Sequence, residues 1–259
     1  MERKLDGWRF VAINGEHGVK WVGGRNGKIY SSPALLAAEA AISATPVGTG
    51  LDGELVPVTS DGVELKSPAV STFLANPRLG RLVYVVFDCL QLGEADITRA
   101  PLTVRKYAIE RLSGNLERDG SVIVSLGQEL DWDVYQSWLD GGSEGCVVKR
   151  KSSPYTTTRS RDWLKLKPQE TCDAVITGYE MGRGEHNRDL PGAFNVSLIG
   201  SGVMTTVKIP DDDTVLSVQR DFSRWEGRLI EIRHHGLFED GKPRHPVMVR
   251  TRQDLEVCT

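Results

Sequence analysis

The sequence predicts an α+β fold in two parts, a larger mixed domain over residues 1–169 and a small β-barrel domain over residues 170–259. Two observations lead to this prediction. Up to Pro168, helix-like and strand-like segments are interspersed, whereas beyond it about five short strands and one helix follow within roughly ninety residues. Such a series of short strands is typical of a closed or partly open barrel such as the OB-fold. The domain boundary is therefore expected near Pro168–Thr171.

The first half of the larger domain shows strand and helix signals in turn. The expected strands are Trp8–Ile13 and Val19–Val22, joined by a turn at Asn14-Gly15, then Leu51–Val58 and the apolar Leu82–Asp88, which would end at a carboxylate. Alternation along Leu51–Val58 places Asp52 and Glu54 on one face. The expected helices are Pro33–Ser43 and Ser67–Asn76, the second capped by Ser67.

The remaining elements follow the same logic. In the larger domain we expect helices over Val104–Leu112 and Asp131–Leu139 and strands over Val122–Leu126, Cys146–Lys149 and Trp163–Lys167. In the smaller domain we expect a helix over Thr214–Trp225 and strands over Ala174–Tyr179, Phe194–Ile199, Val203–Ile209, Arg228–Arg233 and Val247–Thr251.

Composition is that of an ordinary globular protein, with 39% hydrophobic and 26% charged residues and a net charge of -3. The longest strongly apolar run, Leu82–Phe87, is too short to cross a bilayer, and the N-terminus lacks a signal-peptide core. We therefore expect a cytoplasmic protein without a membrane partner. The four cysteines form no Cys-x-x-Cys pair, which argues against a zinc site or a disulfide framework.

The charged residues of the larger domain suit phosphoryl or nucleotidyl transfer. Lys4 lies in the tight turn Lys4–Gly7, and carboxylates occur at Glu54, Asp88 and Glu144. Carboxylates hold hard divalent cations, cations neutralise phosphate oxygens, and a lysine amine can attack phosphorus. An ordinary lysine has a pKa of about 10.4, so nearby cations such as Lys165 and Lys167 would help to favour the neutral amine. An isolated Lys-x-Asp-Gly, however, is more often a solvated turn.

Six short motifs share an order and spacing that are informative together. They are Lys4–Gly7, Asp52–Glu54, Val86–Asp88, Glu144–Lys149, Trp163–Lys167 and Arg244–Asp254. They resemble motifs I, III, IIIa, IV, V and VI of the covalent nucleotidyltransferases, specifically of small phage or bacterial ATP-dependent DNA ligases. The resemblance covers almost the whole chain. It implies a nucleotidyltransferase (adenylation) domain with mixed and antiparallel sheets, followed by an OB-fold domain.

The resemblance also implies roles for individual residues. Lys4 would attack the α-phosphate of ATP and carry AMP, and Asp6 would help to fix its loop. On the base and the sugar, the resemblance implies Glu2 at the adenine edge, Phe87 against the base and Glu54 on the ribose. Arg9 and Arg25 would lie near the nucleotide or the DNA 5′-phosphate. The phosphates would be contacted by Lys149, Lys165 and Lys167, and the β- and γ-phosphates by Arg244, Arg250 and Arg252. Glu54 and Glu144 would hold Mg²⁺ or Mn²⁺.

The implied activity is nick sealing in double-stranded DNA by a monomer that uses ATP. Two enzymatic alternatives share several of these motifs, RNA end-joining and GTP-dependent capping, and a third alternative is a non-catalytic nucleic-acid clamp. The chain departs from the family pattern at Gly24, where a serine or threonine is usual, and at Leu255, where a lysine is common. Only three residues precede Lys4, where relatives have a few tens. Trp163 is expected to pack between the domains.

Overall fold

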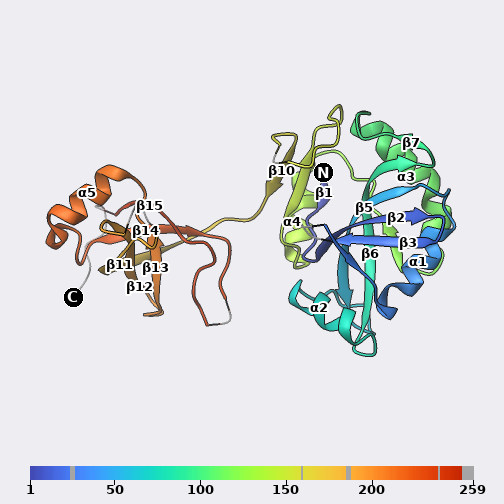
Figure 1. Ribbon diagram of the computed structural model, residues 1–259. Coiled ribbons are helices and arrows are strands. Elements are labelled where there is room, and N and C mark those ends of the chain that lie inside the picture. The colour runs from blue at the N-terminus through green and yellow to red at the C-terminus, as the bar shows by residue number, and fades with distance from the viewer. Residues whose placement is uncertain (24–26, 159, 185–187, 239, 253–259) are drawn as a thin grey trace. The chain divides into compact units, whose positions relative to one another are not determined.

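The chain forms two compact units, Met1–Leu166 and Lys167–Thr259 (Figure 1). The structure is a computed structural model that describes residues 1–23, 27–158, 160–184, 188–238 and 240–252. The division falls after Leu166, where the sequence placed the boundary after residue 169. Within the described ranges, no helix has both the length and the apolar character needed to cross a membrane.

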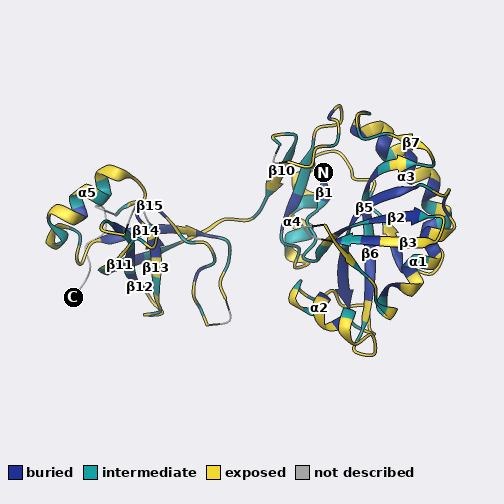
Figure 2. Ribbon diagram, viewed as in Figure 1, coloured by how far each residue is buried: buried dark blue, intermediate teal, exposed yellow. Residues whose placement is uncertain are grey.

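A seven-stranded sheet forms the centre of the first unit. Its order is β4 (Lys28–Tyr30), β3 (Gly18–Gly23), β2 (Trp8–Gly15), β5 (Gly50–Val58), β6 (Arg81–Leu92) and β7 (Ala95–Asp96), and β8 (Val122–Val124) also pairs with β6. All pairings are antiparallel except that of β8 with β6. Strand β6 is buried or half-buried from Leu82 to Leu90, as its apolar sequence predicts (Figure 2).

Helices of the first unit pack against this sheet and bury its main core. The 3₁₀ turn Pro33–Leu35 leads into α1 (Leu36–Ser43), and α2 (Pro68–Ala75) and α3 (Leu102–Leu116) add apolar side chains to the same core. Helix α4 (Trp132–Asp140) begins at Asp131, whose carboxylate accepts hydrogen bonds from two backbone amides. Ser67 does not cap α2 as predicted, because its own backbone is already helical.

A second, three-stranded sheet completes the first unit. Strand β9 (Cys146–Lys149) lies between β1 (Glu2–Arg3) and β10 (Trp163–Leu166), and both pairings are antiparallel. Glu2 pairs with Val147, and Val147 pairs with Lys165, so these three side chains share one face of the sheet. Lys149 lies on that face two residues further along β9, opposite Trp163. This face carries much of the candidate site described below.

The second unit is a closed five-stranded barrel, which confirms the predicted OB-fold architecture. Its order is β11 (Glu170–Met181), β12 (Pro191–Leu198), β13 (Met204–Lys208), β15 (Val247–Thr251) and β14 (Leu229–His234). Helix α5 (Asp212–Arg220) and the 3₁₀ turn Phe222–Arg224 follow β13. A separate apolar core fills the barrel. The predicted α+β fold class is confirmed for the chain.

Besides the Ser67 cap, two sequence-based predictions of local structure were wrong. The β2–β3 turn is not at Asn14-Gly15, because these residues continue the ladder by pairing with Val19 and Gly18. The buried Asn14 side chain instead donates a hydrogen bond to the Thr45 carbonyl at 2.8 Å. Strand β6 also does not end at Asp88. That carboxylate is fully buried and accepts a 2.7 Å hydrogen bond from Arg105, so it links β6 to α3.

Candidate active site

The Lys4 loop is held at both of its ends. At the front, β1 pairs with β9, and the Lys4 amide donates to the Gly145 carbonyl at 2.9 Å. The Lys4 ammonium forms an ion pair with the carboxylate of Glu144, which precedes Gly145 in the chain. The Lys4 side chain is 15% exposed, so this ion pair is only partly accessible to water. The structure therefore brings together the residues of the first and fourth motifs.

The back of the loop rests on strand β5. Leu5 packs against the small apolar cluster of Val56, Val58 and Val83. A Cβ atom at Gly7 would lie 2.2 Å from the Leu55 carbonyl oxygen, so only glycine permits this approach. The Gly7 amide also donates a hydrogen bond to the Glu54 carboxylate. These contacts give a physical reason for the glycine of the Lys-x-Asp-Gly turn.

Glu54 is a half-buried carboxylate beside the Lys4 loop. Burial raises the pKa of Glu54 to about 7, against the opposing effects of Lys4, Arg9 and the Gly7 amide. Glu54 thus takes up a proton more readily than an exposed glutamate does. Asp6 lies half-buried between Leu5 and Gly7; its role stays a prediction.

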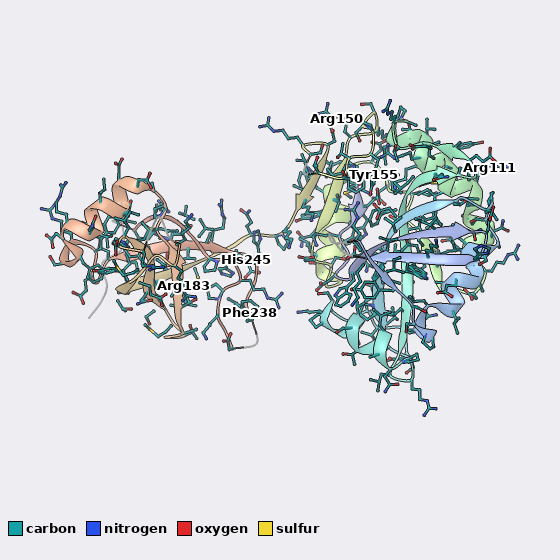
Figure 3. The ribbon with its side chains drawn as sticks, in the orientation of Figure 1. Arg111, Arg150, Tyr155, Arg183, Phe238 and His245 are labelled. Carbon is teal, nitrogen blue, oxygen red and sulfur yellow. The ribbon has the colours of Figure 1, made fainter. Side chains whose placement is uncertain are left out.

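Arg9 is fixed in place by two residues that the sequence did not nominate. Its Nε donates to the Asp52 carboxylate at 3.0 Å, and its Nη2 donates to both Asp52 and the Tyr155 hydroxyl. The Tyr155 hydroxyl in turn donates to Asp52 at 2.9 Å. Arg9 also lies opposite Glu54 on the neighbouring strand, and its positive charge lowers the pKa of Glu54. Arg9 therefore interacts with both Asp52 and Glu54, as expected if these two carboxylates share one face of β5. Figure 3 labels Tyr155 among the side chains of this unit.

An aromatic pair lies next to this arginine. The Phe87 and Trp163 rings meet edge to face with centroids 6.0 Å apart, and the Arg9 guanidinium lies 5.7 Å from the Phe87 centroid. The Lys149 ammonium lies 4.5 Å from the Phe87 centroid and 4.1 Å from that of Trp163. Trp163, for which the sequence favoured packing between the domains, therefore contacts three nominated residues of its own unit.

Glu2 lies in a buried cluster of charges behind the aromatic pair. Its Oε1 accepts from Lys106 at 2.8 Å and from Lys149 at 2.9 Å, and its Oε2 accepts from the Ser125 hydroxyl at 3.1 Å. Burial alone would raise the pKa of Glu2, but the two ammonium groups hold it below its usual value. The sequence nominated Glu2 and Lys149 and missed Lys106, because nothing in the pattern of α3 marks its lysine as inward-facing.

The other nominated residues are distributed over both units. Lys165 shares the face of Glu2 and Val147, whereas β10 ends at Leu166 and Lys167 belongs to the second unit. Arg25 lies outside the described residues, as do the neighbouring Gly24 and Leu255.

The three arginines of the sixth motif lie in the second unit, where each has an identified neighbour. Arg244 stacks on Phe238, with its guanidinium carbon 4.8 Å from the ring centroid. Arg250 donates to Glu231 at 2.7 Å, and Arg252 donates to Asp173 at 3.1 Å. Phe238 is labelled in Figure 3. Their predicted contacts with nucleotide phosphates stay predictions.

Two carboxylates, Glu54 and Glu144, could hold a divalent metal ion. Both interact with Lys4: Glu144 forms an ion pair with its ammonium, and the positive charge of Lys4 lowers the pKa of Glu54. Across the described residues, no group of three or more His, Cys, Asp or Glu side chains is arranged to bind a metal. Mg²⁺ is commonly bound by one or two carboxylates together with substrate phosphates. The donor set therefore fits a metal that arrives with a nucleotide.

A lysine paired with one carboxylate and flanked by a second lies here beside an aromatic pair and a cluster of cations, an arrangement that suits nucleotide chemistry. The chain belongs to the family described as "ATP dependent DNA ligase domain", whose match covers residues 1–167.

Comparison with individual proteins agrees with this assignment. A "Probable DNA ligase" of Rhodococcus opacus (strain B4) is 31% identical over 261 residues, which is 99% of this chain and 48% of that protein. The "SPbeta prophage-derived DNA ligase-like protein LigB" of Bacillus subtilis (strain 168) is 28% identical over 180 residues, covering 69% of this chain and 64% of that one. This chain thus spans roughly half to two thirds of the length of these two relatives.

Among solved structures, the fold resembles one titled "DNA binding with a minimal scaffold: Structure-function analysis of Lig E DNA ligases". The TM-score is 0.68 at 19% identity, and the match covers 97% of this chain and 91% of that one. At this level of identity the likeness speaks for the fold alone.

Proposed function

We propose that this protein is an ATP-dependent DNA ligase that seals nicks between a 3′-hydroxyl and a 5′-phosphate in duplex DNA. The observation that carries the proposal is the setting of Lys4, whose ammonium pairs with Glu144 while Glu54 and Gly7 fix the other side of its loop. Adenylation chemistry is assigned to the first domain, and the OB-fold domain is assigned to closing on the nucleotide and the DNA.

The first step would be transfer of AMP to Lys4. The ammonium loses a proton, Nζ forms a bond to the α-phosphorus of ATP, and the bond from that phosphorus to the bridging oxygen breaks to release pyrophosphate. Glu144, which accepts a hydrogen bond from Nζ, lies where it can receive the proton. A divalent cation held by Glu54 and Glu144 would neutralise phosphate charge when bound.

Two further steps would join the DNA. The DNA 5′-phosphate takes AMP from Lys4, and the 3′-hydroxyl then attacks that phosphate and releases AMP. Phe87 offers its ring to the adenine, while Arg9, Lys149 and Lys165 supply positive charge to phosphates. Lys167, Arg25 and the three arginines Arg244, Arg250 and Arg252 are proposed to add phosphate contacts, and Asp6 to steady the loop. The protein would act as a cytoplasmic monomer.

The decisive experiment is intact-mass measurement after incubation with ATP and Mg²⁺. Wild type should gain the mass of one AMP, Lys4→Ala should gain none, and the control Lys20→Ala, which changes an exposed lysine of β3, should gain it normally. An adduct that persists in Lys4→Ala would overturn the proposal. The adduct should then be consumed on a nicked duplex with formation of a longer strand.

The same experiment separates the alternatives. An adduct formed from GTP instead of ATP would indicate a capping enzyme, and joining of nicked RNA but not DNA would indicate an RNA ligase. Binding to a nick without any adduct would indicate a non-catalytic clamp.

A further inference from the structure

We propose that Lys106 of helix α3 is a positioning residue that anchors the N-terminal strand, and with it Lys4, through the buried carboxylate of Glu2. The inference deepens the proposed function, since Lys4 is the residue that would carry AMP.

The first observation is that the strand leading into Lys4 is short. Strand β1 is only two residues long, Glu2 and Arg3, and within the described ranges its partner strand is β9. Yet Met1 is buried, and its backbone carbonyl accepts a 2.9 Å hydrogen bond from the Gln128 amide. Arg3 also forms an ion pair with Glu64, so side-chain contacts hold β1 in addition to its pairing with β9.

The second observation is that Glu2 supplies such a contact and that Lys106 is one of its principal partners. The Glu2 side chain is 6% exposed, that of Lys149 is 6% exposed and that of Lys106 is 12% exposed, so all three charges are largely withdrawn from water. Lys106 also donates to the Ser125 carbonyl, while the Ser125 hydroxyl donates to Glu2. One carboxylate is therefore shared by two ammonium groups that come from different elements, α3 and β9.

This arrangement makes local opening of β1 costly. If β1 detached, Glu2 would leave with it, and Lys106 and Lys149 would remain near each other without their shared counter-ion. Buried charges that lose a partner are strongly unfavourable. Burial and the nearby Lys149 charge already lower the pKa of Lys106 to about 8, although the Glu2 carboxylate opposes this. The lysine pair thus keeps Glu2, and Lys4 two residues later, in place.

The two members of the pair differ in what they connect. Lys149 links Glu2 to β9, which already pairs with β1, and its ammonium also lies over Phe87 and Trp163. Lys106 links Glu2 to a separate fifteen-residue helix that belongs to the main core. Lys106 is therefore a charged contact that ties the first strand to a helix of the main core.

The test uses Lys106→Met, which keeps most of the unbranched side chain but removes its charge, and Arg111→Met as a matched control. Arg111 is an exposed residue of the same helix and is labelled in Figure 3. We expect backbone amides of residues 2–6 to exchange hydrogen about tenfold faster or more in Lys106→Met, in line with loss of one charge-assisted hydrogen bond. Global stability should fall less than in Glu2→Gln, because Glu2 keeps Lys149 as a counter-ion.

Adduct formation supplies a second, independent measurement. The rate of Lys4 adenylylation at saturating ATP should fall about tenfold to a hundredfold in Lys106→Met, as expected for a displaced nucleophile. Arg111→Met should match wild type in every measurement.

A double variant distinguishes anchoring from a general structural role. Glu2→Gln alone should lower stability markedly, because it leaves two buried ammonium groups together. Adding Lys106→Met to Glu2→Gln should restore part of that loss, since only one ammonium then remains.

Unchanged exchange at residues 2–6 in Lys106→Met would overturn the inference, and so would a loss of global stability proportional to the loss of rate. Hydrogen exchange and unfolding can be measured without nucleotide, so they test the role of Lys106 even if wild type forms no adduct. Absence of an adduct from wild type would count only against the proposed function.

Discussion

Replacement of Glu54 by glutamine should make the protein more stable above neutral pH while it abolishes adenylylation. Burial raises the pKa of Glu54 from its ordinary 4.5 to about 7. Between these values the folded state holds a proton that the unfolded state has lost. The stability that this carboxyl contributes is therefore present below pH 4.5 and is lost as the pH rises toward 7. Glutamine imitates the protonated form at every pH and escapes this loss.

The magnitude follows from the same two pKa values. A change from 4.5 to about 7 corresponds to a free energy of about 3 kcal/mol at most. For a unit of this size that amounts to roughly 6–12 °C in the unfolding temperature. The Gly7 amide can still donate to the glutamine oxygen, so the loop contact survives the replacement. Glu54→Gln and wild type should differ little at pH 5 and by most of this amount at pH 8.

The assay is thermal unfolding of the first unit between pH 5 and pH 8, in metal-free buffer with a chelator. The control is Glu110→Gln, which neutralises an exposed carboxylate of α3 and should leave the pH dependence of wild type unchanged. If the difference in stability between Glu54→Gln and wild type is the same at pH 5 and pH 8, the assignment of a raised pKa to Glu54 is incorrect.

Three further outcomes are expected. Gly7→Ala should destabilise the first unit by about 2 kcal/mol or more and slow adduct formation, because the added Cβ would meet the Leu55 carbonyl; unfolding and intact mass measure this. Tyr155→Phe removes a hydroxyl bonded to Asp52 and should cost about 1 kcal/mol by denaturant unfolding, whereas a neutral result would deny the hydroxyl a role. Affinity for a nicked duplex should fall steeply with added salt, and a flat response in fluorescence anisotropy would contradict a phosphate-contacting surface.

Much of the fold was predictable because its signals are local. Strands β9 and β15 have the bounds that the sequence predicted. The series of short strands after Pro168 indicated the closed barrel. The same reasoning was wrong at Asn14, where a side chain that can form a turn is instead buried against Thr45, a residue far along the chain. Local preference was overridden there by a tertiary hydrogen bond.

The candidate site was predictable only in part. The motif residues Lys4, Glu54 and Glu144 were visible as charges at consistent spacing, and the structure brings them together. The supporting residues Lys106 and Tyr155 could not be predicted, because in the sequence they resemble ordinary charged and aromatic positions. Such residues gain meaning only from contacts across more than a hundred positions, as between Glu2 and Lys106.

The ion pairs of Arg250 and Arg252 with Glu231 and Asp173 have a consequence for turnover. A phosphate that approaches these guanidiniums must exchange with a carboxylate rather than meet a bare cation. Exchange makes binding weaker, but it also makes departure easier, because the carboxylates take back the arginines as the phosphate leaves. If the arginines bind phosphate as proposed, Glu231 and Asp173 would compete with it and favour its release.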